Sequence, residues 1–195
     1  MASNLFKTLE YEAFRAGINP RTKQSRDWFR KKAQEITSVN RRGIVRDEPI
    51  KSKSNFIIGE MYMYFYDPKH KETLPYYDKF PLTIIVDFAK DGFYGLNLHY
   101  LPMTLRAKFL DGLLDTATNE KYDKSTRFRV TYNMLKRSSK MRYFKPCFKH
   151  YLGDHVRGNF AYVPPAEWEI ATFLPTADFK GATENKVYRD SRKAI

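Results

Sequence analysis

The middle of the chain carries the clearest pattern of hydrophobic and polar positions. Residues 59–66 read GEMYMYFY, with methionine and tyrosine alternating, and residues 81–88 read PLTIIVDF, with β-branched residues at the centre. Side chains along a strand point alternately to the two faces of a sheet. Both segments are therefore predicted strands, and their tyrosines are interpreted as core residues rather than as a platform for stacked bases. Asp91-Gly92 predicts a tight hairpin turn into a third strand, and Gly95 indicates a bulge or a close approach of two backbones.

Helical spacing of apolar residues appears before and after these strands. The helix starts are marked by a polar cap, by an anion in the first turn or by a proline at the first position. We predict helices from Leu5 to about Gly17, from a cap at Ser25 to Ile36, over 102–117, over 126–141 and from Pro164 or Pro165 onward. Residues 38–54 are polar and predict an extended linker.

These elements predict an α+β fold with a small antiparallel β-sheet or SH3-like barrel core, surrounding helices, and extended N- and C-terminal arms. A length of 195 residues fits one domain with extensions, and the sequence shows no internal repeat. We therefore divide the chain into a helical and extended basic arm (1–54), an α+β core domain (55–180) and an extended C-terminal tail (181–195).

Positive charge is concentrated in two parts of the chain. Lysine and arginine outnumber aspartate and glutamate by 35 to 22, which gives a formal net charge of +13. Residues 1–53 hold 13 basic and 6 acidic side chains, and residues 124–153 hold nine basic and no acidic ones, so the rest of the chain is mildly acidic. An imbalance of this size concerns partners rather than fold, and nucleic acid or an anionic membrane surface are the physical candidates.

The acid-free segment, residues 124–153, is the main candidate for a binding surface. Its cations are interleaved with aromatic residues, and each lysine or arginine that meets a phosphate releases a condensed counterion. We predict contacts to the phosphate backbone of double-stranded DNA, without sequence readout, from Lys124, Arg127, Arg129, Lys136, Arg137, Lys140, Arg142, Lys145, Lys149, Arg41 and Arg42. The alternatives are an ordinary solvated face and a face that meets acidic patches of a protein partner.

Carboxylates near the predicted strands allow a metal-dependent nuclease as a further alternative. The side chains that could hold a divalent cation are Glu60, Asp67, Asp78, Asp87 and Asp91. Two residues separate Asp87 from Lys90 where the common restriction-type pattern has one. Cys147, His150 and His155 lack a fourth ligand for zinc, and the cysteine lacks an orienting partner for a nucleophile. We therefore predict no enzyme activity, no catalytic residue, no metal and no cofactor.

The single cysteine excludes an intramolecular disulfide and indicates a reducing compartment. The first residues lack the basic-then-apolar layout of a secretory signal, and no apolar run approaches the roughly 20 residues that span a bilayer. We expect a soluble protein of intracellular origin without a membrane partner.

Several segments resemble a known family of phage proteins. They are YFYDPKHKETLPYYDKFPL (64–82), DGFYGLNLHYLP (91–102), LRAKFLDGLLD (105–115), YDKSTRFRVTYNMLK (122–136), RYFKPCFKHYL (142–152), WEIATFLP (168–175) and KVYRDSRK (186–193). Over roughly residues 55–195 the chain is similar to small proteins of T-even-like tailed phages, especially marine ones. Members are labelled DNA end protectors, which are minor virion proteins at the terminus of the packaged genome. The resemblance implies a virion component at the portal, neck or tail and supplies no catalytic residue.

Charge and resemblance together give two functional hypotheses. The first is a phage virion structural protein of the head-neck or tail region, made in the host cytoplasm, whose basic surface faces DNA and protects the packaged genome end. The alternative is a baseplate or tail structural adaptor that binds only neighbouring virion proteins of the portal, neck, tail or baseplate.

Overall fold

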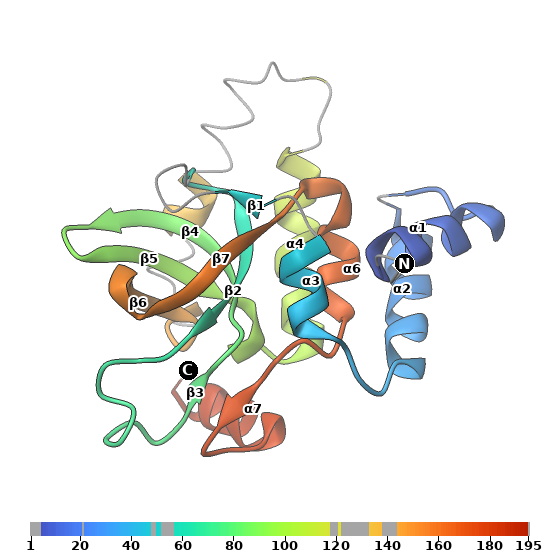
Figure 1. Ribbon diagram of the computed structural model, residues 1–195. Coiled ribbons are helices and arrows are strands. Elements are labelled where there is room, and N and C mark those ends of the chain that lie inside the picture. Colours follow the sequence, from blue (N-terminus) through green and yellow to red (C-terminus); the bar gives the residue numbers. More distant parts are fainter. Residues whose placement is uncertain are drawn as a thin grey trace.

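The computed structural model describes residues 5–20, 22–47, 50–51, 57–117, 121, 133–137 and 144–194. These residues form an α+β protein in which helices lie beside one face of a curled antiparallel sheet (Figure 1). The main sheet has the order β1-β7-β2-β4-β5-β6 and consists of β1 (Ile50–Lys51), β2 (Met61–Tyr66), β4 (Leu82–Ala89), β5 (Gly92–Asn97), β6 (Phe148–Leu152) and β7 (Val156–Val163). A second, two-stranded sheet pairs β3 (Tyr77–Asp78) with β8 (Phe179–Lys180).

The main sheet is strongly curled. A 3₁₀ turn, Gly153–His155, takes the chain from β6 at one edge of the sheet to β7 beside the other edge. The backbone N–H of Leu152 on β6 donates to the hydroxyl of Tyr66 on β2 at 3.2 Å, although these strands are not neighbours in the sheet. No ladder joins β6 to β7 within the described ranges. The small antiparallel sheet is therefore confirmed, and the alternative of an SH3-like barrel is wrong for this part of the chain.

The alternation in β2 sends its side chains to two buried faces, as predicted. Met61 and Met63 are fully buried in the cluster that faces the helices, whereas Tyr62 and Tyr64 are fully buried on the inner side of the curl. Rings from four strands meet there, because Tyr64 lies 5.8, 5.5 and 4.6 Å, between ring centroids, from Phe93, Tyr151 and Phe160. The tyrosines of β2 are core residues.

Helices cover the methionine face of the sheet in two layers (Figure 1). The inner layer contains α3 (Arg41–Asp47), α4 (Met103–Ala117) and α6 (Trp168–Phe173), and the outer layer contains α1 (Leu5–Arg15) and α2 (Lys23–Glu35), which pack on α6. Phe6 and Phe29 from this outer layer belong to the same buried cluster as the methionines of β2. Among the helices of the described ranges, none is both long and apolar enough to cross a membrane.

The segments predicted as extended arms contain helices. Helix α3 forms inside the predicted linker 38–54, and α7 (Glu184–Lys193) forms inside the predicted tail 181–195. The extended tail is therefore wrong for α7, because Thr183 caps this helix by accepting a hydrogen bond from the N–H of Lys186 at 3.3 Å, and Val187 packs inward.

Helix α2 starts earlier than predicted. Thr22, not Ser25, is its N-cap, and the two side chains form a reciprocal capping box in which each accepts from the backbone N–H of the other, at 3.1 Å in both cases. The hydroxyl of Ser25 also donates to Glu169 of α6 at 2.7 Å. The start of α2 is thus fixed by tertiary contact as well as by its cap.

The β4–β5 hairpin turns one residue before the predicted position. Ala89 pairs with Gly92, so the loop consists of Lys90-Asp91. Glycine is needed at position 92 for a different reason than turn geometry. A Cβ atom there would lie 1.9 Å from the carbonyl oxygen of Tyr151 on β6, closer than any non-bonded contact allows.

Gly95 lies at a position where the sequence predicts a bulge or a close approach of two backbones. A Cβ atom there would lie 2.2 Å from Cγ2 of Thr83, and the register of β4 against β5 shifts between Ile85 and Asp87, opposite this glycine. Of the two predicted alternatives, the bulge is confirmed opposite this glycine, and the closest approach is to a side chain of β4 rather than to its backbone.

A buried polar cluster ties together the segments near β3. Asp78 accepts from Asn97 Nδ2 at 3.0 Å and lies 2.7 Å from His99 Nδ1, while the other ring nitrogen of His99 lies 3.0 Å from the hydroxyl of Thr176. Burial raises the pKa of Asp78, but His99 and the hydrogen bonds from His99, Asn97 and the Phe80 N–H outweigh it, and the net pKa is lowered. These side chains are almost inaccessible to solvent, so the cluster serves the fold.

Candidate nucleic-acid interface

Six of the predicted DNA-contacting residues lie in the described part of the chain. The other five, Lys124, Arg127, Arg129, Lys140 and Arg142, lie outside the described residues. The six fall into two groups. In two of them the charged group contacts other parts of the protein, and the other four side chains are exposed.

Arg41 and Lys149 have their charged groups engaged by the fold. Arg41 donates to the carbonyl oxygens of Thr176 and Ala177 at 2.8 and 2.6 Å, which ties α3 to the loop after α6. The Lys149 ammonium lies over the ring of Tyr100, 4.1 Å from its centroid, and desolvation lowers the pKa of this lysine. Arg41 therefore supports the fold, whereas Lys149 is a half-buried cation at the edge of an aromatic group.

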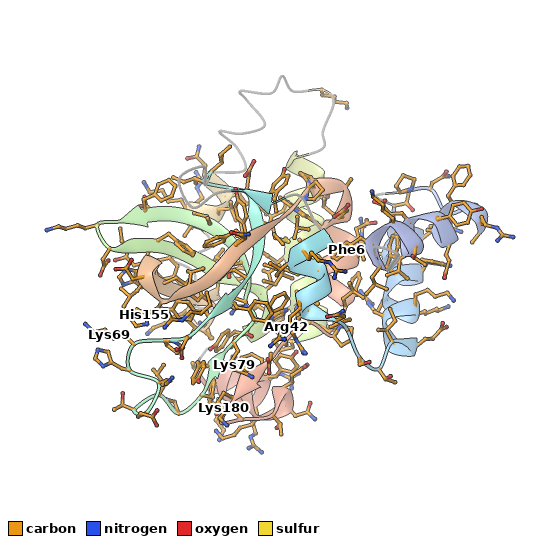
Figure 2. The ribbon with its side chains drawn as sticks, in the orientation of Figure 1. Phe6, Arg42, Lys69, Lys79, His155 and Lys180 are labelled. Carbon is orange, nitrogen blue, oxygen red and sulfur yellow. The ribbon has the colours of Figure 1, made fainter. Side chains whose placement is uncertain are left out.

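The four exposed candidates are Arg42, which is labelled in Figure 2, Lys136, Arg137 and Lys145. Lys136 and Arg137 sit on the helical residues 133–137, in which Leu135 is fully buried. Met134 lies against α4, since a Cβ atom on Gly112 would be only 2.7 Å from Met134 Cε. Two apolar side chains thus anchor this helical piece and leave its two basic side chains on the outside.

An aromatic–lysine patch is formed by Tyr76, Tyr100, Lys149, Phe179 and Lys186. Tyr100 lies 6.2 Å from Tyr76 and 5.2 Å from Phe179, between ring centroids. The ammonium of Lys186 lies 5.4 Å from the centroid of Tyr76. The two lysines, from β6 and α7, are therefore connected through two adjacent rings.

Helix α7 carries basic side chains in a segment that is predicted from the sequence to be an extended tail. Its basic side chains are Lys186, Arg189, Arg192 and Lys193, all exposed, and its acidic ones are Glu184 and Asp190. One of the cations is paired within the helix, because Lys186 Nζ lies 2.5 Å from Asp190 Oδ2. The signal for the helix is a capping threonine with an acidic first turn and a basic last turn.

The carboxylates of the nuclease alternative do not gather into a metal site. Asp78 is buried in the polar cluster, Asp67 pairs with Lys71 and Arg157, and Asp91 pairs with His150 at 3.1 Å. Over the described ranges, no group of three or more histidine, cysteine or acidic side chains is placed to hold a metal ion.

Cys147 is a buried side chain rather than a reactive thiol. Its Sγ donates to the carbonyl oxygen of Phe144 at 3.1 Å, and burial raises the pKa of the thiol to about 12. A thiol with this pKa is protonated at neutral pH and is a poor nucleophile and a poor metal ligand.

Comparison with known protein families places the chain in a class of phage proteins that protect DNA. The family model described as Phage T4 terminal DNA protecting protein matches residues 4–192, which is nearly the whole chain. The chain belongs to this family, and the resemblance to DNA end protectors is confirmed. The match also includes the N-terminal helices, which the resemblance over 55–195 did not cover. No curated protein and no solved structure gives a significant match.

Proposed function

We propose that this protein is a virion protein of the head-neck or tail region that binds the end of the packaged DNA through a basic surface and shields it from nucleases. The observation that carries the proposal is the match of residues 4–192 to a family of terminal DNA protecting proteins. The concentration of the net charge of +13 into two parts of the chain supports it. The protein acts by occupying the DNA end and not by catalysing a reaction.

The phosphate backbone is the expected contact. Arg137 and Lys145 are exposed cations in the acid-free segment, and Arg42 is an exposed cation on α3. Lysine and arginine bind phosphates irrespective of base sequence, and the gain comes largely from released counterions. A protein that must cover any genome end needs this kind of binding, because its target is a position on the DNA and not a sequence.

The test is binding of the full-length protein to linear duplex DNA over a series of salt concentrations. Affinity should fall steeply with salt, and in the double variant Arg137→Ala, Lys145→Ala the slope of log affinity against log salt should be smaller by about two, or about one per lost phosphate contact. The matched control is Lys23→Ala, Lys31→Ala, which removes the same charge from exposed positions of α2. If both double variants changed the slope equally, DNA would be attracted by the net charge of the protein and not by contacts of Arg137 and Lys145.

End protection is tested separately with an exonuclease. The protein should slow digestion of a linear duplex from its ends, and it should bind the linear form more tightly than a covalently closed circle of the same sequence. Equal affinity for both forms, together with unimpeded digestion, would overturn the proposal.

Contact with neighbouring virion proteins is a second candidate function, favoured by one observation. Phe14 and Tyr11 on α1 are 80% and 62% exposed, although large aromatic side chains are usually buried. Aromatic residues on a surface are enriched in protein interfaces. Phe14→Ser should leave DNA binding intact and weaken incorporation into particles, and unchanged incorporation would exclude this contact.

A further inference from the structure

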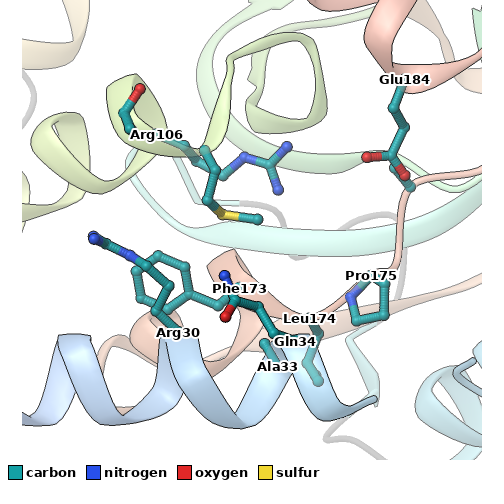
Figure 3. Close-up of a pocket in the computed structure, with 11 residues that line it drawn as sticks. Arg30, Ala33, Gln34, Arg106, Phe173, Leu174, Pro175 and Glu184 are labelled. Carbon is teal, nitrogen blue, oxygen red and sulfur yellow. The ribbon is translucent and has the colours of Figure 1, made fainter. Parts of the chain in front are cut away.

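A cavity of about 330 Å³ lies where α2, the start of α4, the loop after α6 and the start of α7 meet (Figure 3). Arg30, Thr104, Arg106 and Glu184 supply its charged and hydroxyl groups, and Phe173 and Pro175 are among its apolar residues. We call this cavity the α4 pocket. Its volume exceeds that of a phosphate group and is comparable to that of a nucleotide.

Arg106 carries a buried positive charge beside the pocket. Its side chain is 2% exposed and donates to three neutral oxygens, the carbonyls of Thr172 and Leu101 and the hydroxyl of Tyr188, at 3.0, 3.2 and 3.2 Å. Its Nε has no hydrogen-bond partner in the described structure. Hydrogen bonds to neutral groups offset only part of the free energy that a buried guanidinium loses when it leaves water. An anion close to Arg106 would therefore be stabilising.

The start of α4 adds a second attraction for an anion at the same place. The backbone N–H groups of Leu105 and Arg106 donate to the carbonyl of Pro102 at 2.9 Å, whereas the helix leaves its first N–H groups, on Met103 and Thr104, without an intrahelical acceptor. No acidic residue occupies the first turn of this 15-residue helix. The positive end of the helix dipole therefore points toward a cavity that also contains a buried arginine.

Arg30 brings a further cation to the wall of the pocket. Its guanidinium lies 5.2 Å from the ring centroid of Phe173, and its Nε has no hydrogen-bond partner among the described residues. The carboxylate closest to it along α2, Asp27, is 3.8 Å away in a pair that is more than a third exposed on both sides. Figure 3 shows Arg30 rising from α2, Arg106 extending from α4, and Glu184 at the opposite side of the view from Arg30.

We propose that the α4 pocket binds the terminal phosphate of a DNA strand, an inference that rests on the proposed function of binding DNA ends. A terminal phosphate monoester carries a charge of about −2 at neutral pH, against −1 for a phosphodiester inside a strand. It also has a single sugar attached, whereas an internal phosphate would have to bring two sugars past the rim. Charge and access therefore both favour the end of a strand over its interior.

The negative charge of Glu184 would repel a phosphate in the α4 pocket. It accepts a hydrogen bond from the Tyr188 hydroxyl at 2.9 Å, and the same hydroxyl accepts from Arg106, so a chain of hydrogen bonds joins the carboxylate to the buried guanidinium. Glutamine at position 184 can still accept from the tyrosine but carries no charge. Glu184→Gln should therefore strengthen phosphate binding while it keeps this chain intact.

The experiment measures binding of the full-length protein to duplexes that differ only in their ends: 5′-phosphate, 3′-phosphate or hydroxyl. The wild-type protein should bind one phosphorylated end about tenfold more tightly than the hydroxyl end, as expected for a charge-assisted contact. Arg30→Gln should reduce this ratio to about twofold, and Glu184→Gln should increase it. Lys31→Gln, which removes a neighbouring exposed charge of α2, should leave the ratio unchanged. These variants avoid the fully buried Arg106, whose replacement endangers folding.

The outcomes separate this inference from the proposed function. Salt-dependent binding of DNA with equal affinity for phosphate and hydroxyl ends would overturn the phosphate pocket and leave the proposed function standing. Inorganic phosphate and a deoxynucleoside 5′-monophosphate serve as probes without a duplex, read out by the melting temperature. If they stabilise the wild type but not Arg30→Gln while DNA ends show no preference, the pocket belongs to a free phosphate ligand and the assignment to DNA ends is wrong.

Discussion

Asp78 is a single buried residue that joins several segments distant in the sequence. Its carboxylate contacts side chains or backbone N–H groups of Phe80, Asn97, His99 and Asp178, at 2.7 to 3.2 Å, and so joins β3 to the end of β5 and to the start of β8. A buried charge is tolerated where several donors satisfy it, and the loss of the charge leaves these donors without a partner.

Replacement of this carboxylate should destabilise the protein in a way that depends on pH. Asp78→Asn should lower the free energy of unfolding by about 3 kcal/mol at neutral pH. Because the native pKa of Asp78 is lowered from 3.8, the contribution of its charge is fully present above pH 4 and is lost as the pH falls through the native pKa. Urea unfolding at about pH 7 and about pH 3 should show a smaller difference between variant and wild type at the lower pH.

The control for this prediction is Asp87→Asn, which changes an exposed carboxylate whose hydrogen bond reaches only the next residue in the chain. Its free energy of unfolding should stay within about 0.5 kcal/mol of the wild type. An Asp78 variant that resembles this control would show that the buried cluster contributes little.

At the scale of elements, β5 is a strand whose two neighbours leave no room for a Cβ atom at its glycines. It lies between β4 and β6, and its two glycines face the backbone of β6 and a side chain of β4. Glycine weakens an isolated strand, so its presence at both positions is explained by the space that the adjacent strands leave. The β5–β6 pair also positions Lys149 over Tyr100.

Gly92→Ala should separate β5 from β6. The added Cβ atom would lie 1.9 Å from a backbone oxygen, which cannot move without breaking the strand pairing, so we expect a loss of about 3 kcal/mol or more. Gly153→Ala is the matched control in the same region, because its Cβ atom would lie an ordinary 3.6 Å from the carbonyl oxygen of Asp91. Thermal unfolding of the two variants gives the comparison, and equal melting temperatures would contradict the account of Gly92.

The elements that the sequence predicts well are those with a strong local pattern. The alternating methionines and tyrosines of β2, the β-branched centre of β4 and the apolar stripe of α4 all identify their elements without help from distant residues. Helices α3 and α7 were missed because their polar composition resembles a linker, and their stability comes from contacts far away in the sequence, such as those of Arg41 and Val187.

The candidate site was only partly predictable for a similar reason. Composition identifies basic residues, but the fold decides which of them reach solvent. The contacts of Arg41 with two carbonyl groups and of Lys149 with a ring depend on loops and strands that no local pattern connects. The α4 pocket combines residues from four separate segments, so a reading of neighbouring positions could not reveal it.

At the scale of the whole molecule, the net charge of +13 means that salt should act in opposite directions on the stability of the free protein and on its affinity for DNA. Like charges repel one another in the folded protein, and dissolved ions screen this repulsion within a distance of about 10 Å at 0.1 M salt. The same ions should weaken the proposed binding to DNA because they reduce the gain from counterion release. Salt should thus stabilise the protein while it weakens the complex.

This contrast can be measured on one preparation. Between low and moderate sodium chloride the melting temperature of the free protein should rise by a few degrees, while the affinity for linear DNA falls. Sodium chloride is preferred to sodium phosphate for this purpose, since phosphate would also bind the proposed pocket. A melting temperature that falls with added salt would mean that attractive ion pairs outweigh the repulsion.

The pairing of β2 has a consequence for synthesis of the protein on the ribosome. One neighbour of β2 is β4, which follows soon afterwards, but the other is β7, which leaves the ribosome only after β4, β5, α4 and β6. Until Val163 has emerged, the nascent chain presents the second edge of β2 without its partner, and open strand edges are sites of aggregation. Translation that stops before β7 should therefore release a product in which one edge of β2 lacks its partner strand.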